Sequence, residues 1–411
     1  MTMQLERTDA RPQCPIDHSA FSRQKTAQVS EPAGKPIERN ADGVWHVYNF
    51  EEARAILRQT GTKQAGFRAE LLESMPSSMK PPVLYQEGEA HLTQRKQTAR
   101  FFTPKATGAN YRHLMETLSE TIVADLKRKG RADLSELSMQ LAVQVAAQVI
   151  GLTNSRLPGM ARRIDAFFSG SGLEFSWRPR ALYNFVRAQV RVAAFFYLDV
   201  QPAIAARKKG AQADVISHLL EQAYSAGEIL TECITYAAAG MATTREFISV
   251  AAWHLLEQPE LRARFLHGSD QEREGLLQEM LRLEPVVGHL YRRTTAPVSL
   301  QSAGQSVTIG VGELIDIHVY AVNGDESVVG EHADAICPAR KLASERIPPA
   351  VMSFGDGHHR CPGAYVALQE SDIFLQRLLA LDGLRIERPP TLLWSDITKG
   401  YELRDFVVAV D

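Results

Sequence analysis

The sequence predicts a mainly helical fold with small β-sheets. Helical patterns, with apolar residues three and four positions apart, cover about residues 111–153, 160–200 and 228–257. Strand patterns are short: residues 43–48 alternate between polar and apolar, and residues 307–319 form two such runs around a glycine turn. Helical patterns therefore dominate the chain, and strands are a minor component.

The length and composition are those of an ordinary globular protein. The chain has 411 residues, of which 45% are hydrophobic and 23% charged. No linker rich in Pro, Gly and Ser divides it, so residues 31–411 are expected to form one domain after a flexible tail of residues 1–30. The net charge of −2 gives no reason to expect a nucleic-acid partner. No apolar run approaches the roughly 20 residues that cross a membrane, and the N-terminus lacks an apolar signal core, which predicts a cytoplasmic protein.

Four cysteines lie far apart without a C-x-x-C pair: Cys14, Cys233, Cys337 and Cys361. This spacing argues against a disulfide or zinc framework and fits a reducing compartment. Cys361 differs from the others because it follows a glycine-rich turn and precedes a predicted helix at residues 364–379. A thiolate is a strong metal ligand, stabilised by positive charge and by the N–H groups of a helix start. The alternative for Cys361 is an inert buried cysteine.

The turn before Cys361 has the spacing F-x-x-G-x-x-x-C-x-G, in the stricter form F-G-x-G-x-H-x-C-x-G. This stretch, residues 354–363, resembles the haem-ligand loop of the cytochrome P450 family. The resemblance implies a P450-like haem-thiolate fold and heme b as cofactor, with the thiolate of Cys361 as axial ligand. It also assigns four neighbours to haem binding: Phe354, Gly355, His359 and Gly363.

A second motif suits the acidic edge of a haem. His91 and Arg95 are four residues apart, so they share a helix face; such a pair alone would often be a solvated face. It precedes Phe102-Thr103-Pro104, and this run is similar to the family segment that holds a haem propionate. Arg292 fits the family's other propionate arginine, with Arg293 as an alternative. The resemblance thus implies that His91, Arg95, Arg292 and His359 pair with the propionates, whose burial needs cationic partners.

A third motif lies in the middle of the long helical pattern, at residues 238–244. Its residues are small, and a threonine hydroxyl there can bond back to the preceding turn and distort the helix. The segment resembles the family's oxygen-binding motif [AG]-G-x-[DE]-T-[TS], which implies that Gly240, Thr243 and Thr244 lie beside bound oxygen. Ala242 stands where the family usually has an acid. Because a hydroxyl relays protons but is a poor reservoir, we expect water or Glu246 to recharge Thr243, and we favour a water-fed relay because Arg245 could hold Glu246 elsewhere. The alternatives are a slower relay and a proton supplied by the substrate.

A fourth motif predicts a structural charge network. Glu279 and Arg282 lie one helical turn apart, and such a pair alone contributes little when exposed. Arg340 follows in a P-x-R turn, 21 residues before Cys361. By resemblance to the family, the three are expected to form a charge-assisted network that anchors the haem loop.

The resemblance also implies a pocket and a lid. Residues 160–200 would form the lid over the substrate, with a glycine hinge at residues 170–172, and Phe67, Leu71, Leu72 and Met75 are apolar enough to line a pocket. His289 would lie on the substrate side, where it would bind a polar substrate group or be satisfied by the backbone.

The activity implied is O₂-dependent oxidation of an apolar or aromatic small molecule with two electrons. The chain ends soon after the haem motifs, so a separate donor is expected, such as ferredoxin with its reductase. This donor would dock near Lys96, Arg100, Arg360 and Arg377. Two alternatives stay open. Ala242 favours a haem-thiolate enzyme with atypical chemistry (peroxide-driven, dehydrogenating or coupling), and the third possibility is a non-enzymatic haem sensor.

Overall fold

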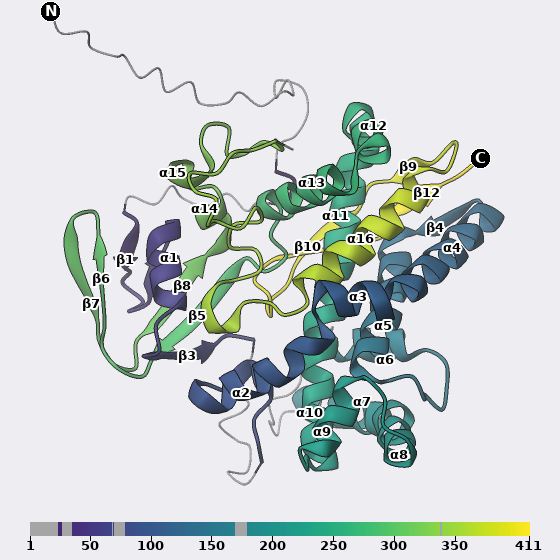
Figure 1. The fold of residues 1–411 in the computed structure, drawn as a ribbon, viewed down its shortest axis with the longest axis horizontal. Coiled ribbons are helices and arrows are strands. Elements are labelled where there is room, and N and C mark those ends of the chain that lie inside the picture. The colour runs from purple at the N-terminus through teal and green to yellow at the C-terminus, as the bar shows by residue number, and fades with distance from the viewer. Residues whose placement is uncertain (1–23, 27–34, 68, 70–78, 169–178, 338) are drawn as a thin grey trace, which may run out of the picture.

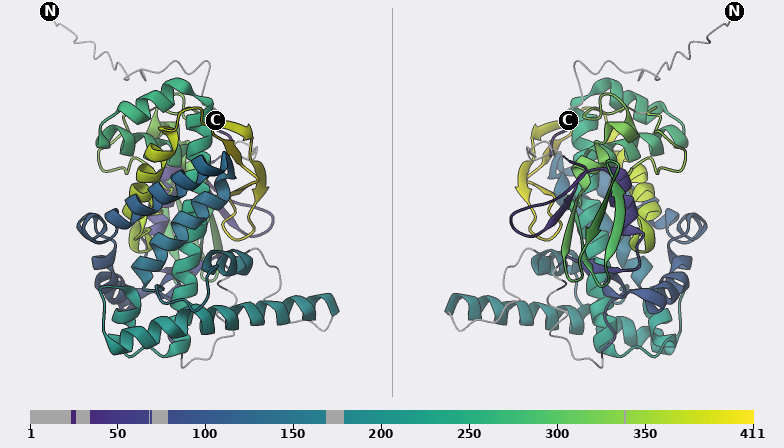
Figure 2. Two further views of the ribbon diagram at one scale, coloured as in Figure 1. Left: turned by 90° about the vertical axis from the view of Figure 1, so that its right-hand side faces the viewer. Right: turned by 90° about the vertical axis from the view of Figure 1, so that its left-hand side faces the viewer.

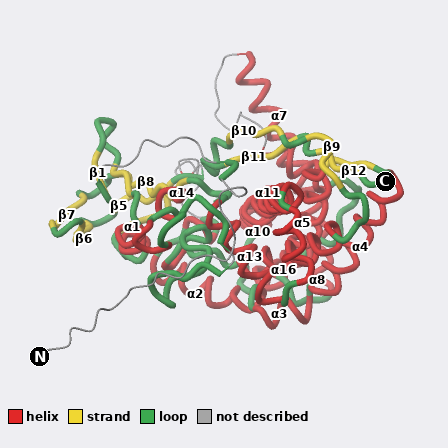
Figure 3. Tube along the Cα trace, turned by 90° about the horizontal axis from the view of Figure 1, so that it is seen from above, coloured by secondary structure: helices red, strands yellow, loops and turns green. Residues whose placement is uncertain are grey.

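A helical part and a smaller β-rich part lie side by side (Figures 1 and 3). This computed structural model describes residues 24–26, 35–67, 69, 79–168, 179–337 and 339–411. The α-helices are α1 (Phe50–Leu57), α2 (Gly88–Thr98), α3 (Pro104–Asn110), α4 (Arg112–Lys129), α5 (Leu134–Ile150), α6 (Met160–Phe168), α7 (Pro179–Phe195), α8 (Gln201–Lys209), α9 (Val215–Glu221), α10 (Ala226–Ala237), α11 (Thr243–Glu257), α12 (Pro259–His267), α13 (Asp270–Leu283), α14 (Val319–Asn323), α15 (Glu326–Val329) and α16 (Ala364–Leu379).

The strands form four small sheets among the described residues. The largest has five strands in the order β1-β2-β8-β5-β3, in which β2 and β8 are parallel and the other neighbours antiparallel. The others are β6-β7, β10-β11 and β4-β12-β9. The bounds are β1 (Ile37–Arg39), β2 (Trp45–Val47), β3 (Thr62–Ala65), β4 (Arg131–Asp133), β5 (His289–Thr294), β6 (Val298–Ser302), β7 (Gln305–Ile309), β8 (Leu314–His318), β9 (Arg385–Arg388), β10 (Thr391–Trp394), β11 (Tyr401–Arg404) and β12 (Val407–Ala409).

Local sequence signals explain where the main helices begin and end. Ser225 and Glu228 form a capping box at the start of α10, and Ser269 and Glu272 do the same for α13. At α1 the N-cap position is Asn49, as expected, but its side chain makes no cap hydrogen bond. Asp325 instead accepts the hydrogen bond of the Phe50 N–H, at 3.0 Å.

Two buried clusters divide the hydrophobic core. The larger packs helices α4, α5, α10, α11, α13 and α16 together, and its residues include Phe265, Phe374 and Tyr401. The smaller lies between α1 and one face of the five-stranded sheet, with Val47, Ile315 and Ile317 at its centre. The mainly helical fold with small sheets is therefore confirmed, and the segment that carries the cysteine loop runs from the smaller cluster into the larger.

The predicted long helix at residues 228–257 is present as one continuous rod. It consists of α10, a π-helical turn η5 (Ala238–Ala242) and α11. A second π-helical turn, η4 (Phe196–Val200), follows α7, and α7 itself extends away from the rest of the molecule (Figures 2 and 3). Tyr183, Val186 and Val190 are exposed on it, whereas Phe195 at its end is buried.

Two expectations about the chain's periphery need correction. Residues 24–26 do not behave as a free tail, because Thr26 is fully buried and its N–H and hydroxyl bond to the carboxylate of Glu284. Cys337 is disulfide-bonded, whereas the wide spacing of the cysteines predicts no disulfide. The predicted hinge at residues 170–172 and the pocket residues 71, 72 and 75 lie outside the described residues. Within the described chain, no helix is long and apolar enough to span a bilayer.

Candidate active site

The glycine-rich stretch forms a closed loop that holds Cys361 at the start of α16. The N–H of Cys361 donates to the carbonyl of Phe354 at 2.8 Å, which joins the two ends of the loop. The backbone N–H groups of Gly363 and Ala364 hydrogen-bond to the sulfur and lower the pKa of the thiol, as do the charges of Arg95 and Arg360, although burial has the larger effect and raises it overall. The loop therefore presents a sulfur with donors placed to stabilise a thiolate.

The sulfur of Cys361 is open to a ligand. Its side chain is accessible, although the protein around it raises the pKa of its thiol by burial. Thr243 has a similarly accessible hydroxyl in an otherwise buried helix, and α11 and α16 pack against each other.

Close contact with α1 fixes the other side of the loop. Gly357 has φ +64°, and a Cβ at this position would lie 2.2 Å from the carbonyl oxygen of Leu57. Only glycine allows the two backbones to approach so closely. Asp356 adds ion pairs with Arg58 at 3.1 Å and Arg54 at 3.5 Å. The loop is thus held between α1 and α16.

The predicted charge network is present and buried. Arg282 forks onto both carboxylate oxygens of Glu279 at 2.8 Å, and Arg340 binds the same carboxylate at 2.7 Å. Arg282 also donates to the carbonyl of Asn323. The side chain of Asn323 in turn accepts from the Met352 N–H at 2.8 Å and donates to Ser353. The network therefore reaches the segment just before the cysteine loop, which is the anchoring role expected for it.

Three of the predicted anion-binding side chains gather at the other end of the loop. The imidazoles of His91 and His359 are stacked, with ring centroids 4.1 Å apart, and Arg95 donates to the carbonyl of Arg360. Burial and the positive charge of His359 and Arg95 lower the pKa of His91 to about 4. An anion bound here would reverse this effect, because it would favour the charged imidazole.

Arg292 joins the group through a carboxylate that sequence reasoning missed. Glu87 accepts from Arg292 at 3.0 Å and lies 3.0 Å from the Nε2 of His359. Burial raises the pKa of Glu87, but the hydrogen bond of His359 and the charge of Arg292 outweigh it, so the net shift is downward. Arg293 points elsewhere and donates to the carbonyl of Gly312. Of the two arginines, Arg292 is therefore the one on the side of His359. Glu87 could have been found from the sequence, because it precedes His91 by four residues.

The distorted helix opposite the loop follows the prediction. The Thr243 hydroxyl donates to the carbonyl of Ala239, and the π-helical turn occupies the preceding residues. Gly240 faces α5, where an added Cβ would lie 3.7 Å from Ala146. Any role of Gly240 in ligand binding would therefore involve its backbone.

Glu246 is not placed to recharge Thr243, which corrects that expectation. Its carboxylate is buried and accepts from the Leu403 N–H at 2.7 Å, from Arg404 at 2.7 Å and from Arg245 at 2.8 Å. These partners fasten α11 to β11. A carboxylate occupied by three donors is not free to pass a proton to Thr243.

A different carboxyl group lies beside the threonine pair. Glu370 of α16 is buried, and the Thr244 hydroxyl hydrogen-bonds to it. Burial raises the pKa of Glu370 well above its ordinary value, against a smaller opposite effect of Thr244. Its Oε2 has no hydrogen-bond partner among the described residues. Sequence reasoning missed Glu370 because it lies over one hundred residues from Thr244, although only nine after Cys361.

Comparisons with known proteins agree with this geometry. The cytochrome P450 family model matches residues 182–381. The biotin biosynthesis cytochrome P450 of Bacillus subtilis (strain 168) is 25% identical over 367 residues, covering 87% of this chain and 86% of that protein. The mycinamicin IV hydroxylase/epoxidase of Micromonospora griseorubida is 24% identical, covering 90% of each.

The chain belongs to the cytochrome P450 family. Solved P450 structures confirm the fold. P450BioI, in complex with an acyl carrier protein ligated to hexadec-9Z-enoic acid, has a TM-score of 0.73 at 22% identity and covers 92% of this chain and 95% of that chain. The structure of CalO2 has a TM-score of 0.76 at 21% identity, and the match covers 92% of this chain and 93% of that chain. The family's cofactor is haem held by a cysteine thiolate.

The residues of this P450 fit that cofactor. The sulfur of Cys361 is accessible and has N–H donors beside it, as a thiolate ligand requires. A cluster that can carry positive charge, His91, Arg95 and His359, lies at one end of the same loop, as propionates require. The Thr243 hydroxyl is accessible on the distorted helix.

Proposed function

We propose that this P450 uses O₂ and two electrons from a separate redox partner to oxidise an apolar or partly aromatic small molecule. The observation that carries the proposal is the closed loop that presents Cys361. When bound, haem supplies the iron at which dioxygen is activated, and a thiolate ligand favours cleavage of the O–O bond. The remaining roles belong to residues of the chain.

The chain's first task is to hold the cofactor. We assign Cys361 to the iron, with its charge stabilised by the N–H groups of Gly363 and Ala364. His91, Arg95 and His359 are assigned to the propionates, and Arg292 supports them through Glu87. Glu279, Arg282 and Arg340 keep the loop in place and take no part in the chemistry.

The second task is proton delivery without an acid at position 242. The Thr243 hydroxyl is positioned to pass protons because it is accessible and oriented by Ala239. We propose that water reaches it and that Glu370, whose pKa burial raises well above its ordinary value, serves as the buried proton store behind Thr244. This assignment replaces Glu246, whose carboxylate is committed to β11.

An apolar substrate agrees with the ligands of related structures. P450BioI was solved with a fatty acid linked to acyl carrier protein, and CYP109E1 of Bacillus megaterium with corticosterone. Electron transfer would use the cationic side chains near the cysteine loop. Lys96, Arg100 and Arg360 are exposed, as a docking site for an acidic ferredoxin requires. Two of the four predicted cations have acidic partners: Arg100 pairs with Glu221 at 3.9 Å and Arg377 with Glu120 at 3.2 Å.

Turnover with labelled oxygen tests the proposal. The protein is reconstituted with ferredoxin and ferredoxin reductase, and substrates are first found by the shift in haem absorption that binding produces. We expect product that contains one ¹⁸O atom from ¹⁸O₂, and a reduction rate that falls as ionic strength rises.

Two outcomes would replace the proposal. Product formation with peroxide alone, but not with O₂ and electrons, would favour the atypical chemistry that Ala242 suggests. Binding of ligands without any oxidation by competent partners would favour a haem sensor.

A further inference from the structure

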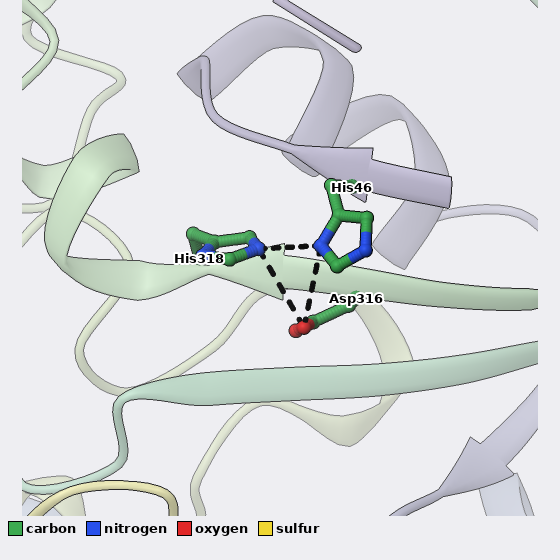
Figure 4. A group of neighbouring side chains, drawn as sticks. All are labelled: His46, Asp316 and His318. Carbon is green, nitrogen blue, oxygen red and sulfur yellow. Dashed lines mark hydrogen bonds and ion pairs between the residues drawn. The ribbon is translucent and has the colours of Figure 1, made fainter. Parts of the chain in front are cut away.

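Two histidines and an aspartate meet on the five-stranded sheet, away from the cysteine loop (Figure 4). The Nδ1 of His46 lies 2.8 Å from the Nε2 of His318. The Oδ2 of Asp316 lies 3.6 Å from the first nitrogen and 3.5 Å from the second. These three side chains point toward one another, and the two nitrogens and the oxygen form a triangle.

The sheet fixes this arrangement. His46 of β2 is the register partner of Asp316 in the parallel strand β8, and His318 lies two residues further along β8. Side chains two apart share a sheet face, so all three project from the same face. Their neighbours Val47, Ile315 and Ile317 project from the opposite face, into the core against α1.

The cluster is also separate from the haem site. On β5, Leu290 approaches Gly355 of the cysteine loop, with 3.9 Å between its Cδ1 and the position of a Cβ at Gly355. His289 and Tyr291, the alternate residues of the same strand, face Asp316 instead. The sheet therefore separates the cluster from the loop.

The buried negative charge of Asp316 favours the binding of a cation. Asp316 is only 4% exposed, and a buried carboxylate needs a paired positive charge. In the part of the chain that the structure describes, its ion-pair partners are His46, His289 and His318, and no lysine or arginine pairs with it.

An outer layer of side chains orients the possible ligands. The Nδ1 of His289 lies 2.8 Å from the Oδ1 of Asp316, the oxygen that faces away from the triangle, and Tyr291 hydrogen-bonds to the same side chain. The Oδ2 of Asp42 lies 3.6 Å from the outer nitrogen of His46. Carboxylates and donors in these positions are typical of metal sites, because they fix the ligand orientation. They also give His289 a partner, because its Nδ1 pairs with the carboxylate of Asp316 and not with the backbone.

We propose that His46, Asp316 and His318 bind one zinc-like divalent cation, with water as the fourth ligand, in a structural site that joins β2 to β8. Tetrahedral zinc holds such ligand atoms about 3.3 Å apart, close to the two nitrogen–oxygen separations. The two nitrogens need to separate by about 0.5 Å, which a small rotation of either ring provides. The side chains of His46 and His318 are 13% and 20% exposed, which leaves access for ion and water.

Calorimetry with zinc tests the proposal. Zinc chloride is titrated into the untagged holoprotein after EDTA treatment, and the same is done with His46→Asn, His318→Asn and His113→Asn. His113 is an exposed histidine of α4 outside the cluster, so it controls for surface binding. We expect one zinc per chain, an affinity more than about 100-fold lower in the two cluster variants, and no change in His113→Asn. Zinc should also raise the melting temperature of wild type but not of His318→Asn.

X-ray absorption at the zinc edge of the wild-type protein gives a test that needs no variant. We expect a first shell of nitrogen and oxygen only. A sulfur ligand, the absence of any bound zinc, or equal affinity in His46→Asn and His318→Asn would overturn the proposal. In that case the cluster is a hydrogen-bonded network of histidines around Asp316. The haem absorption of each variant confirms that it is folded.

Discussion

Ala242 stands where the family usually has an acid. This difference affects the neighbouring residue, Thr243. The hydroxyl of Thr243 is accessible and bonded to Ala239. A methyl group could occupy the same space but could not pass a proton. The local chemistry therefore depends on this one hydroxyl more than it would with an acid next to it.

Thr243→Ala is expected to separate electron use from product formation. Product formation should fall by about 100-fold, the lower range for a lost proton-transfer group, while electron consumption falls far less and peroxide accumulates. Thr243→Ser is the matched control, because it retains the hydroxyl and should retain most coupling. Unchanged coupling in Thr243→Ala would show that protons take another route.

Glu370→Gln tests whether the buried carboxyl holds a proton. The folded protein keeps this proton because burial raises the pKa of Glu370 well above 4.5, whereas the unfolded chain releases it near that value. The raised pKa of Glu370 therefore stabilises the wild-type protein. This contribution is fully present below about pH 4.5 and is lost as the pH rises through the pKa of the folded state. Glutamine does not titrate, so the unfolding free energy of Glu370→Gln relative to wild type should increase with pH above about 4.5. Urea unfolding between pH 5 and pH 8 measures this difference, and parallel curves would contradict it.

At the scale of elements, the cysteine loop depends on the close approach of Gly357 to α1. Gly357→Ala would place its Cβ 2.2 Å from the Leu57 carbonyl, so the loop would have to move away from α1 and the protein should lose haem. Gly312→Ala is the matched control. Gly312 has φ +80° but open space around it, so only the backbone penalty of about 1 kcal/mol applies. Haem content and urea unfolding compare the two; equal effects would show that the contact with α1 is unimportant.

The charge network between α13 and the cysteine loop makes a second prediction at this scale. Glu279→Gln leaves two buried arginines short of a negative partner, which should destabilise the protein by about 3–5 kcal/mol. Glu116→Gln removes the exposed pair with Arg112 on α4 and should cost less than about 1 kcal/mol. Chemical denaturation measures the unfolding free energy of both variants. Similar losses in the two would contradict a stabilising role for the buried network.

Much of these elements could be predicted from sequence because the signals are local. The back-bonding threonine predicts the distortion that appears as the π-helical turn before Thr243. The loop, the E-x-x-R pair and the H-x-x-x-R pair are short motifs with fixed spacing. The roles of Glu246 and Glu370 could not be predicted, because they depend on β11 and α16 packing against α11. A helical period places Glu246 near Thr243 but does not show that Leu403 and Arg404 hold its carboxylate.

At the scale of the whole molecule, two sites lie on opposite faces of one sheet. The cysteine loop approaches β5 from the face of Leu290, and the histidine cluster lies on the other face. The cluster could not be found from sequence, because His46 and His318 are 272 positions apart and meet only through strand pairing. The absence of cysteine pairs excludes only cysteine-based metal sites.

The central claim is that the thiolate of Cys361 binds the haem iron, and the carbon-monoxide difference spectrum of the reduced protein tests it directly. We predict the red-shifted haem band that thiolate ligation produces in wild type and in Cys233→Ser, which removes the other free cysteine of the described residues, buried in the helical core. Cys361→Ser should lose that shift. Wild-type protein without the shift, or Cys361→Ser that retains it, would contradict the assignment.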